Sequence, residues 1–289
     1  MTLSERPARA DRKVRRPAHA AVVEDVAERA RVAAARERAR VYGGVALLGV
    51  ALLLSWEFPI GLVIQRRYVS KPSEVAARLG DLAFGGRLWH HIATTMSEAG
   101  LGYLIGVAVG LVAALLLVAV PLLDEIVGPF LAAFYSIPKI ALAPMFIMWF
   151  GLGALPKVLL AALMVFLVVL VNTIAGIRAI SPGLVEVSRV LGARGLTLVR
   201  AVVLPGAAPA VLASVRLTFS RAMVGAILGE FIAATQGLGF LIVRSSRQFE
   251  TATMFAGIVV VAALVLIVNG VIRLLEARLL PWSGAEVHG

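Results

Sequence analysis

The sequence contains no cysteine, and charged residues occupy only 16% of its 289 positions. The absence of cysteine excludes disulfide bonds, thiolate metal sites and a cysteine nucleophile. The scarcity of charge argues against a soluble domain, in which about a quarter of the residues are charged. Acidic residues are the scarcer kind, 17 against 28 basic ones, and the net charge is +11. This composition indicates a membrane protein with basic flanks.

Motifs for catalysis and nucleotide binding are also missing. The sequence has no G-x-x-x-x-G-K-[ST] phosphate loop, no H-E-x-x-H zinc motif and no G-x-S-x-G nucleophile motif. His90 and His91 are adjacent, so a helix would point them to different sides, and no carboxylate cluster accompanies them. We therefore expect no catalytic residues, no metal site and no ATP-binding site in this chain.

Long apolar runs fill most of the remaining sequence. Three of them contain no charged residue: 99–123, 158–177 and 251–272. Each reaches the roughly 20 residues that a helix needs to cross about 30 Å of hydrocarbon. Three further segments are nearly as apolar: 41–64, 126–156 and 201–234. Because a backbone exposed to lipid must form its hydrogen bonds internally, the sequence predicts an all-α membrane protein with six transmembrane helices.

These runs divide the chain into a transmembrane domain, residues 41–280, and two tails. A basic tail, residues 1–40, precedes the domain, and a short C-terminal tail, residues 281–289, follows it. The six spans are expected at about residues 41–64, 98–122, 126–150, 156–178, 205–234 and 251–273.

Arginine and lysine set the expected orientation, because they are enriched in cytoplasmic segments. With the N-terminal tail inside, seventeen basic residues fall on the cytoplasmic side and eight on the other. We therefore expect both termini and the loop 179–204 to be cytoplasmic. About 40 mostly polar residues precede the first apolar run, so no cleaved signal peptide is expected. Topology and anionic lipid headgroups explain the positive charge, and no nucleic-acid partner is expected.

The loop 179–204 is unusually structured for a connection between two spans. Ser181 and Pro182 are typical of a helix start, and Gly192 ends the helix that they begin. A second short helix should follow and end near Pro205. One side of the first helix is apolar, so the loop needs a surface to pack on. That surface is either the ends of the spans or a soluble partner.

Five intramembrane residues are candidates for lining a translocation pathway: Arg221, Lys139, Asn172, Arg216 and Glu230. A charge at the bilayer centre costs roughly 2.5–3.5 kcal/mol, so it usually faces protein or water. Arg221 lies near the middle of the fifth span and is the preferred contact for an anionic solute. Lys139 lies beside Pro138 in the third span, which Pro144 also breaks. The alternative is that these residues lock helices together, or that Arg216 reaches the cytoplasmic interface.

Three glycines recur every four residues in the second span: Gly102, Gly106 and Gly110. A ridge of small residues lets a neighbouring helix approach closely. We expect the ridge to pack against another helix of the same chain rather than against a second copy.

The loop also carries a spaced motif. Glu186 is followed by Gly192 after five residues, then by Val202 after nine more, and then by Leu204 and Pro205. This spacing resembles the signature of ABC-importer permeases, E-A-A, three residues, G, nine residues, I, one residue, L-P. Here Val187 and Ser188 replace the two alanines, and Val202 replaces the isoleucine.

The resemblance extends over about residues 73–282. It includes the segments "WFGLGALPK", "VNTIAGIR", "LPGAAPAVLASVRLTFSRAMVGAILGEFIAATQGLGFLI" and "LLEARLLPW". The pattern is similar to the nitrate, sulfonate and taurine branch of binding-protein-dependent ABC permeases. It implies a type I importer transmembrane domain in the bacterial inner membrane.

In this family the loop 179–204 would be a coupling helix that docks on a separate ABC ATPase subunit. The docking residues implied are Glu186, Val187, Ser188, Leu191, Gly192, Ala193, Leu204 and Pro205. The resemblance further implies a homodimer, an external solute-binding protein, and ATP and Mg bound by the ATPase, with no cofactor in this chain. The implied mechanism is alternating access.

The implied solute is a small anion such as a sulfonate, taurine or nitrate. Two alternatives remain open at this point. The chain could belong to the same type of importer for a thiamine-precursor pyrimidine, or it could be a secondary carrier driven by an ion gradient. A carrier would normally show a carboxylate relay in the membrane and an internal repeat, whereas the sequence shows only Glu230 deep in a span.

Overall fold

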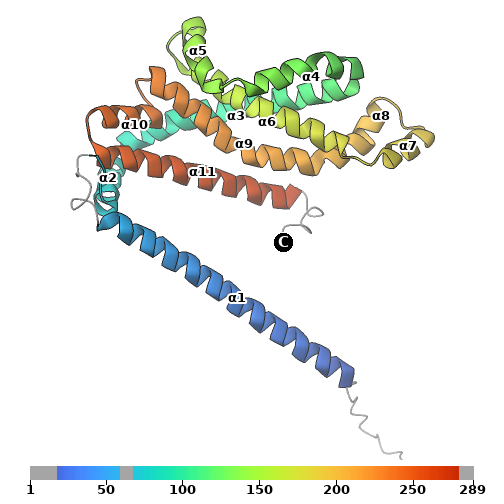
Figure 1. The fold of residues 1–289 in the computed structure, drawn as a ribbon, viewed down its shortest axis with the longest axis horizontal. Helices are drawn as coiled ribbons and strands as arrows, with labels where there is room; N and C mark the ends of the chain where they lie inside the picture. Colours follow the sequence, from blue (N-terminus) through green and yellow to red (C-terminus); the bar gives the residue numbers. More distant parts are fainter. Residues whose placement is uncertain (1–17, 59–67, 280–289) are drawn as a thin grey trace, which may run out of the picture. The chain divides into compact units, whose positions relative to one another are not determined.

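The computed structural model describes residues 18–58 and 68–279, and every regular element in these ranges is helical (Figure 1). The α-helices are α1 (Ala18–Glu57), α2 (Pro72–Phe84), α3 (Arg87–Ala119), α4 (Pro121–Ser136), α5 (Ala143–Phe150), α6 (Ala154–Arg178), α7 (Pro182–Val190), α8 (Leu196–Leu198), α9 (Leu204–Ala233), α10 (Leu238–Arg247) and α11 (Thr251–Leu279). A 3₁₀ turn, η1 (Lys139–Leu142), precedes α5, and a π-helical turn, η2 (Val199–Val203), precedes α9.

Six membrane spans can be counted. Five helices are long and apolar enough to cross a bilayer, in α1, α3, α6, α9 and α11. The sixth is the pair α4 and η1–α5, which is bent by 89°. Pro138 and Pro144 flank η1, and proline removes a backbone donor and restricts the preceding residue. The predicted all-α fold and the break in the third apolar segment are confirmed, and the count agrees with the predicted six if the bent pair crosses the membrane as one span.

Helix α1 belongs to a separate unit, Met1–Pro59. It is one continuous helix of 40 residues, so residue 41, the expected start of the first span, lies inside it. All other helices belong to the second unit, Ile60–Gly289. The expected C-terminal tail, residues 281–289, lies outside the described residues, as does the first part of the N-terminal tail, residues 1–17.

Helix α6 is the centre of the second unit, with α3 on one side and α9 on another. The glycine ridge of α3 lies against it: a Cβ at Gly106 would come within 2.6 Å of the Ala162 carbonyl oxygen. Gly102 and Gly110 meet α6 equally closely one turn away on either side. The ridge therefore packs within the chain, because only glycine leaves room for this approach.

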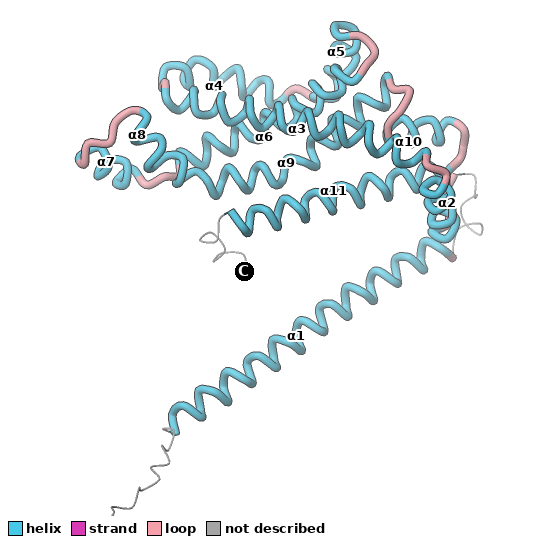
Figure 2. Tube along the Cα trace, turned by 180° about the vertical axis from the view of Figure 1, so that it is seen from behind, coloured by secondary structure: helices cyan, strands magenta, loops and turns pink. Residues whose placement is uncertain are grey.

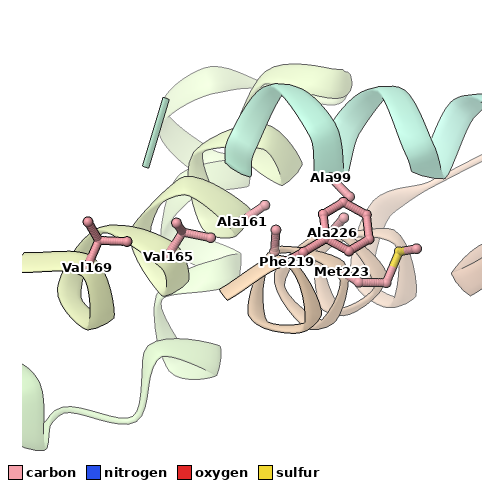
Figure 3. Packing of buried hydrophobic residues seen from close by; sticks show 8 residues of the cluster. Ala99, Ala161, Val165, Val169, Phe219, Met223 and Ala226 are labelled. Carbon is pink, nitrogen blue, oxygen red and sulfur yellow. The ribbon is translucent and has the colours of Figure 1, made fainter. Parts of the chain in front are cut away.

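Helix α9 completes the core from the other side. Phe219 and Met223 are buried with Ala161 and Val165 of α6 and with Ala99 of α3 (Figure 3). Its own glycines, Gly225 and Gly229, lie directly on the α6 backbone at Ala161 and Lys157. The three spans are thus held at close range by small residues, and side chains fill the space that remains.

The second unit has two distinct ends, visible in both Figure 1 and Figure 2. At the end that we call the α10 end, α2 and α10 gather near the starts of α3 and α11 and the C-terminus of α9. Leu88, Leu238, Leu241 and Val260 form a small apolar core there. At the other end, the α7 end, the loop 179–204 joins α6 to α9 and carries α7 and α8 (Figure 2).

Candidate functional site

The loop 179–204 folds as two short helices with a sharp turn between them. Ser181 has extended backbone and Pro182 is the first helical residue of α7, as the sequence predicts. Helix α7 ends where Gly192 adopts φ +92°, and the Ala193 amide donates to the Ser188 carbonyl over 2.9 Å. The left-handed conformation at Gly192 turns the chain back, which a residue with a Cβ would do only under strain.

Helix α7 exposes apolar side chains instead of burying them. Val190 and Leu191 are 84% and 82% exposed, and Leu184 and Val187 are more than half exposed. Glu186 lies on α7 among them and is also exposed. Within residues 68–279, an apolar helix surface at the α7 end is therefore left without a covering element.

The loop joins α9 through a corner of irregular helix. The five residues of η2 are wound as a π-helix, a form that is rare and often found at functional positions. Val202 is buried there, whereas Leu204 and Pro205 are exposed at the start of α9. All eight residues of the expected docking set thus lie at the α7 end: in α7, in the turn after it, and at the start of α9.

Arg221 is exposed near the middle of α9. It shares one face of this helix with Leu217, Val224 and Phe231, all exposed, which we call the α9 stripe. Within the described residues, Arg221 has no hydrogen bond or ion pair. The protein therefore presents an unpaired guanidinium in the middle of an apolar helix face.

Three of the other candidates lie apart from Arg221 and from one another. Arg216 forms a 3.2 Å ion pair with Glu276 and so ties α9 to α11. The Lys139 ammonium donates to the Tyr135 carbonyl oxygen and lies over the Tyr135 ring. Asn172 is exposed on α6. The structure does not gather the five candidates into one site.

Glu230, the fifth candidate, is 2% exposed and is held by hydrogen bonds. Its carboxylate accepts from the Thr95 hydroxyl at 2.7 Å and from the Gly239 amide at 2.5 Å. The Leu238 amide donates to Thr95, and the Gly237 amide donates to His91 Nδ1. Glu230 and two side chains of α3 thus cap the N-terminus of α10 and fix it against α9 and α3.

A buried ion pair beside Glu230 was not foreseen from the sequence. The Lys157 ammonium donates to Glu98 over 2.7 Å, and both side chains are more than 90% buried. The partners are 59 residues apart and belong to α3 and α6. Glu98 comes just before the apolar run 99–123 and Lys157 just before the run 158–177, a position typical of the membrane edge, so the sequence does not predict that either charge is buried. In the structure Gly229 of α9 lies against Lys157, a contact that the sequence does not indicate.

Comparison with known proteins shows which family the chain resembles. The family model described as "Binding-protein-dependent transport system inner membrane component" matches residues 106–281. The aliphatic sulfonates transport permease protein SsuC of Bacillus subtilis is 31% identical, over 83% of this chain and 87% of that protein. The riboflavin transport system permease protein RibX of Chloroflexus aurantiacus is 34% identical, over 84% and 91%. The taurine transport system permease protein TauC of Escherichia coli is 27% identical, over 83% and 89%.

Solved structures share the fold. An amino acid ABC transporter crystallised with histidines superposes with a TM-score of 0.54 at 19% identity, covering 69% of this chain and 97% of that one. The methionine ABC transporter MetNI in an inward facing conformation gives a TM-score of 0.53 at 22% identity, covering 68% and 94%. At these identities the likeness concerns the fold of the transmembrane domain.

Proposed function

Because the chain belongs to the family of inner membrane components of binding-protein-dependent transport systems, we propose that it is the permease of an ATP-driven importer working by alternating access. In this proposal a separate ATPase binds ATP and Mg, an external protein delivers the solute, and two copies of the chain form the pathway. The chain itself makes and breaks no covalent bond and needs no cofactor. As a multi-pass protein of the bacterial inner membrane, it supplies the moving spans.

The apolar surface of α7 carries the proposal. Leu184, Val187, Val190 and Leu191 are exposed along α7 and just after it, and the described residues leave them uncovered. Burying a side chain of this size stabilises by about 1.5–3 kcal/mol, so a groove on a soluble partner would gain several such terms. The exposed carboxylate of Glu186 on the same helix adds a charged contact for that partner. The ATPase subunit is the partner that fits this position.

The connection of the loop to α9 supports a mechanical role. Movement of α7 would pass through η2 and Pro205 into α9. Helix α9 would transmit this movement to α6, because the two helices are in direct backbone contact at Gly225 and Gly229. Closure of the ATPases would then rotate packed spans rather than bend single ones.

Arg221 supports a pathway for an anion. A guanidinium facing lipid at this depth would cost several kcal/mol, so the α9 stripe must face protein or water in the assembled transporter. A second copy opposite this stripe would enclose a pathway with one arginine from each subunit. The relatives named above transport chemically different solutes, so the anionic class rests on Arg221 and not on their names.

Uptake into proteoliposomes tests this function. The chain is reconstituted into liposomes with the ATPase encoded beside it and with the binding protein. Uptake of taurine, methanesulfonate and nitrate is then measured with ATP inside the liposomes. We expect ATP-dependent uptake of at least one anion that ionophores do not abolish, and its loss in Arg221→Gln with the complex still assembled. Uptake that needs no ATP and stops when ion gradients collapse would contradict the importer. ATP-dependent transport of neutral solutes only would contradict the anionic class.

A further inference from the structure

A small cavity lies between the end of α9 and α10, at the end of the unit opposite α7. Its volume is about 240 Å³, and Phe231 and Phe240 are among its walls. Since a water molecule takes up about 30 Å³ in the liquid, this space suits a ligand of a few heavy atoms. It is smaller than the roughly 300–1,000 Å³ typical of drug-sized ligands.

Two arginines line this cavity. Arg244 and Arg247 are three residues apart, so they are neighbours on one face of α10, and Gln248 adds an amide. Within residues 68–279, no carboxylate pairs with either guanidinium. Favourable interaction with the C-terminus of α10 explains arginines in its last turn, but it does not require both to line one cavity. A guanidinium matches the paired oxygens of a carboxylate or sulfonate.

The one carboxylate at the cavity does not oppose an anion there. Glu230 is among the lining residues, yet it is 2% exposed and its oxygens accept from Thr95 and the Gly239 amide. Its charge is thus turned into the helix bundle. The same hydrogen bonds fix the start of α10, so the cavity has a rigid wall rather than a mobile flap.

The cavity lies at the upper end of the α9 stripe. Phe231 belongs both to the stripe and to the cavity wall, and it is ten residues from Arg221. Ten helical residues span about 15 Å, so the stripe leads from the cavity to the unpaired guanidinium at mid-span. The part of the stripe between Arg221 and the cavity therefore has an arginine at one end and the cavity arginines at the other, with Val224 and Phe231 between them.

We propose that this cavity is a receiving site for small oxyanions, held by Arg244 and Arg247 before they pass along the α9 stripe to Arg221. The inference rests on the proposed function, which places the α10 end outside the cell. An acidic side chain of the binding protein could use the same chemistry. The small volume of the cavity, which suits a ligand of a few heavy atoms, favours a free oxyanion over a protein surface.

Saturation-transfer NMR on the permease–ATPase complex in nanodiscs tests the site, because it detects weak binding. The probe is methanesulfonate, and its neutral analogue of similar shape is dimethyl sulfone. We expect binding of the sulfonate only, weakened at least tenfold by Arg244→Gln/Arg247→Gln. The control Arg87→Gln removes a positive charge from an exposed residue at the same end and should leave binding unchanged.

Each other outcome overturns the inference. If the Arg244→Gln/Arg247→Gln variant binds methanesulfonate as well as the wild type does, the two arginines do not hold the anion. If dimethyl sulfone binds as well as methanesulfonate, the cavity selects for apolar shape and not for charge. If the wild type binds no sulfonate while the variant loses docking of the purified binding protein, the arginines serve an acidic protein surface. Co-purification of the ATPase is scored in the same samples. Its absence would count against the proposed function, whereas its presence without sulfonate binding counts against this site alone.

Discussion

The two ends of the helix bundle are built on different principles. At the α10 end, Glu230, Thr95 and the α10 amides are joined by hydrogen bonds within the chain. At the α7 end, apolar side chains are exposed and the helix geometry is irregular. The start of α10 is held by contacts within the chain, whereas the apolar side of α7 is left exposed by the described residues. Substitutions at the two ends should therefore separate folding from assembly.

The largest effect on stability is expected from Lys157→Met. This change leaves the Glu98 carboxylate buried beside Glu230 without its cation, and breaking a buried pair costs about 3–5 kcal/mol. One Glu98 oxygen already lacks a hydrogen-bond partner within the described residues, so little can compensate. Thermal unfolding in detergent measures the loss.

The double variant Glu98→Gln/Lys157→Met is the matched control, because it removes both charges together. We expect it to recover most of the stability that Lys157→Met loses. A single variant as stable as the wild type would mean that the pair is not buried as described.

A smaller loss is expected from Gly106→Ala. The added methyl group would lie 2.6 Å from the Ala162 carbonyl oxygen, so α3 and α6 must move apart. Overpacking of this kind costs about 1–3 kcal/mol. The control is Gly128→Ala in α4, where nothing lies within 4 Å of the new methyl group. Equal unfolding temperatures for the two variants would argue against the close approach of α3 and α6.

The smallest effect on stability is expected from the Arg216–Glu276 pair. Their side chains remain 32% and 20% exposed, so water screens the interaction and its worth is about 1 kcal/mol or less. A double-mutant cycle with Arg216→Gln and Glu276→Gln measures the coupling. A coupling of several kcal/mol would place the pair in a drier environment than the structure shows.

The spans and the shape of the loop could be predicted because their causes are local. Apolar length determines a transmembrane helix, and Ser181, Pro182 and Gly192 begin and end α7 by their own backbone preferences. The break at Pro138 and Pro144 could be predicted for the same reason, because it follows from the two prolines themselves. Its angle of 89° could not be predicted from them. The glycine ridge could also be predicted, since spacing alone shows that it shares one face.

The polar contacts could not be predicted, because they join residues far apart in the chain. Glu98 meets Lys157 across 59 residues, and Thr95 meets Glu230 across 135. The residues around each of these side chains in the sequence give no indication of its partner. For this reason the sequence offers Arg216 and Glu230 as candidates beside Arg221. In the structure Arg216 pairs with Glu276 and Glu230 accepts from the Gly239 amide, whereas Arg221 has no partner among the described residues.

Capture of the ATPase by two leucine variants tests the central claim most directly. Leu191 at the α7 end and Leu152 near the start of α6 are 82% and 81% exposed, so aspartate at either position should cost little stability. The tagged chain is purified with its neighbouring ATPase, and the ratio of the two is measured. We predict that Leu191→Asp lowers the ratio at least tenfold while Leu152→Asp keeps it. Equal ratios in both variants would contradict docking through α7.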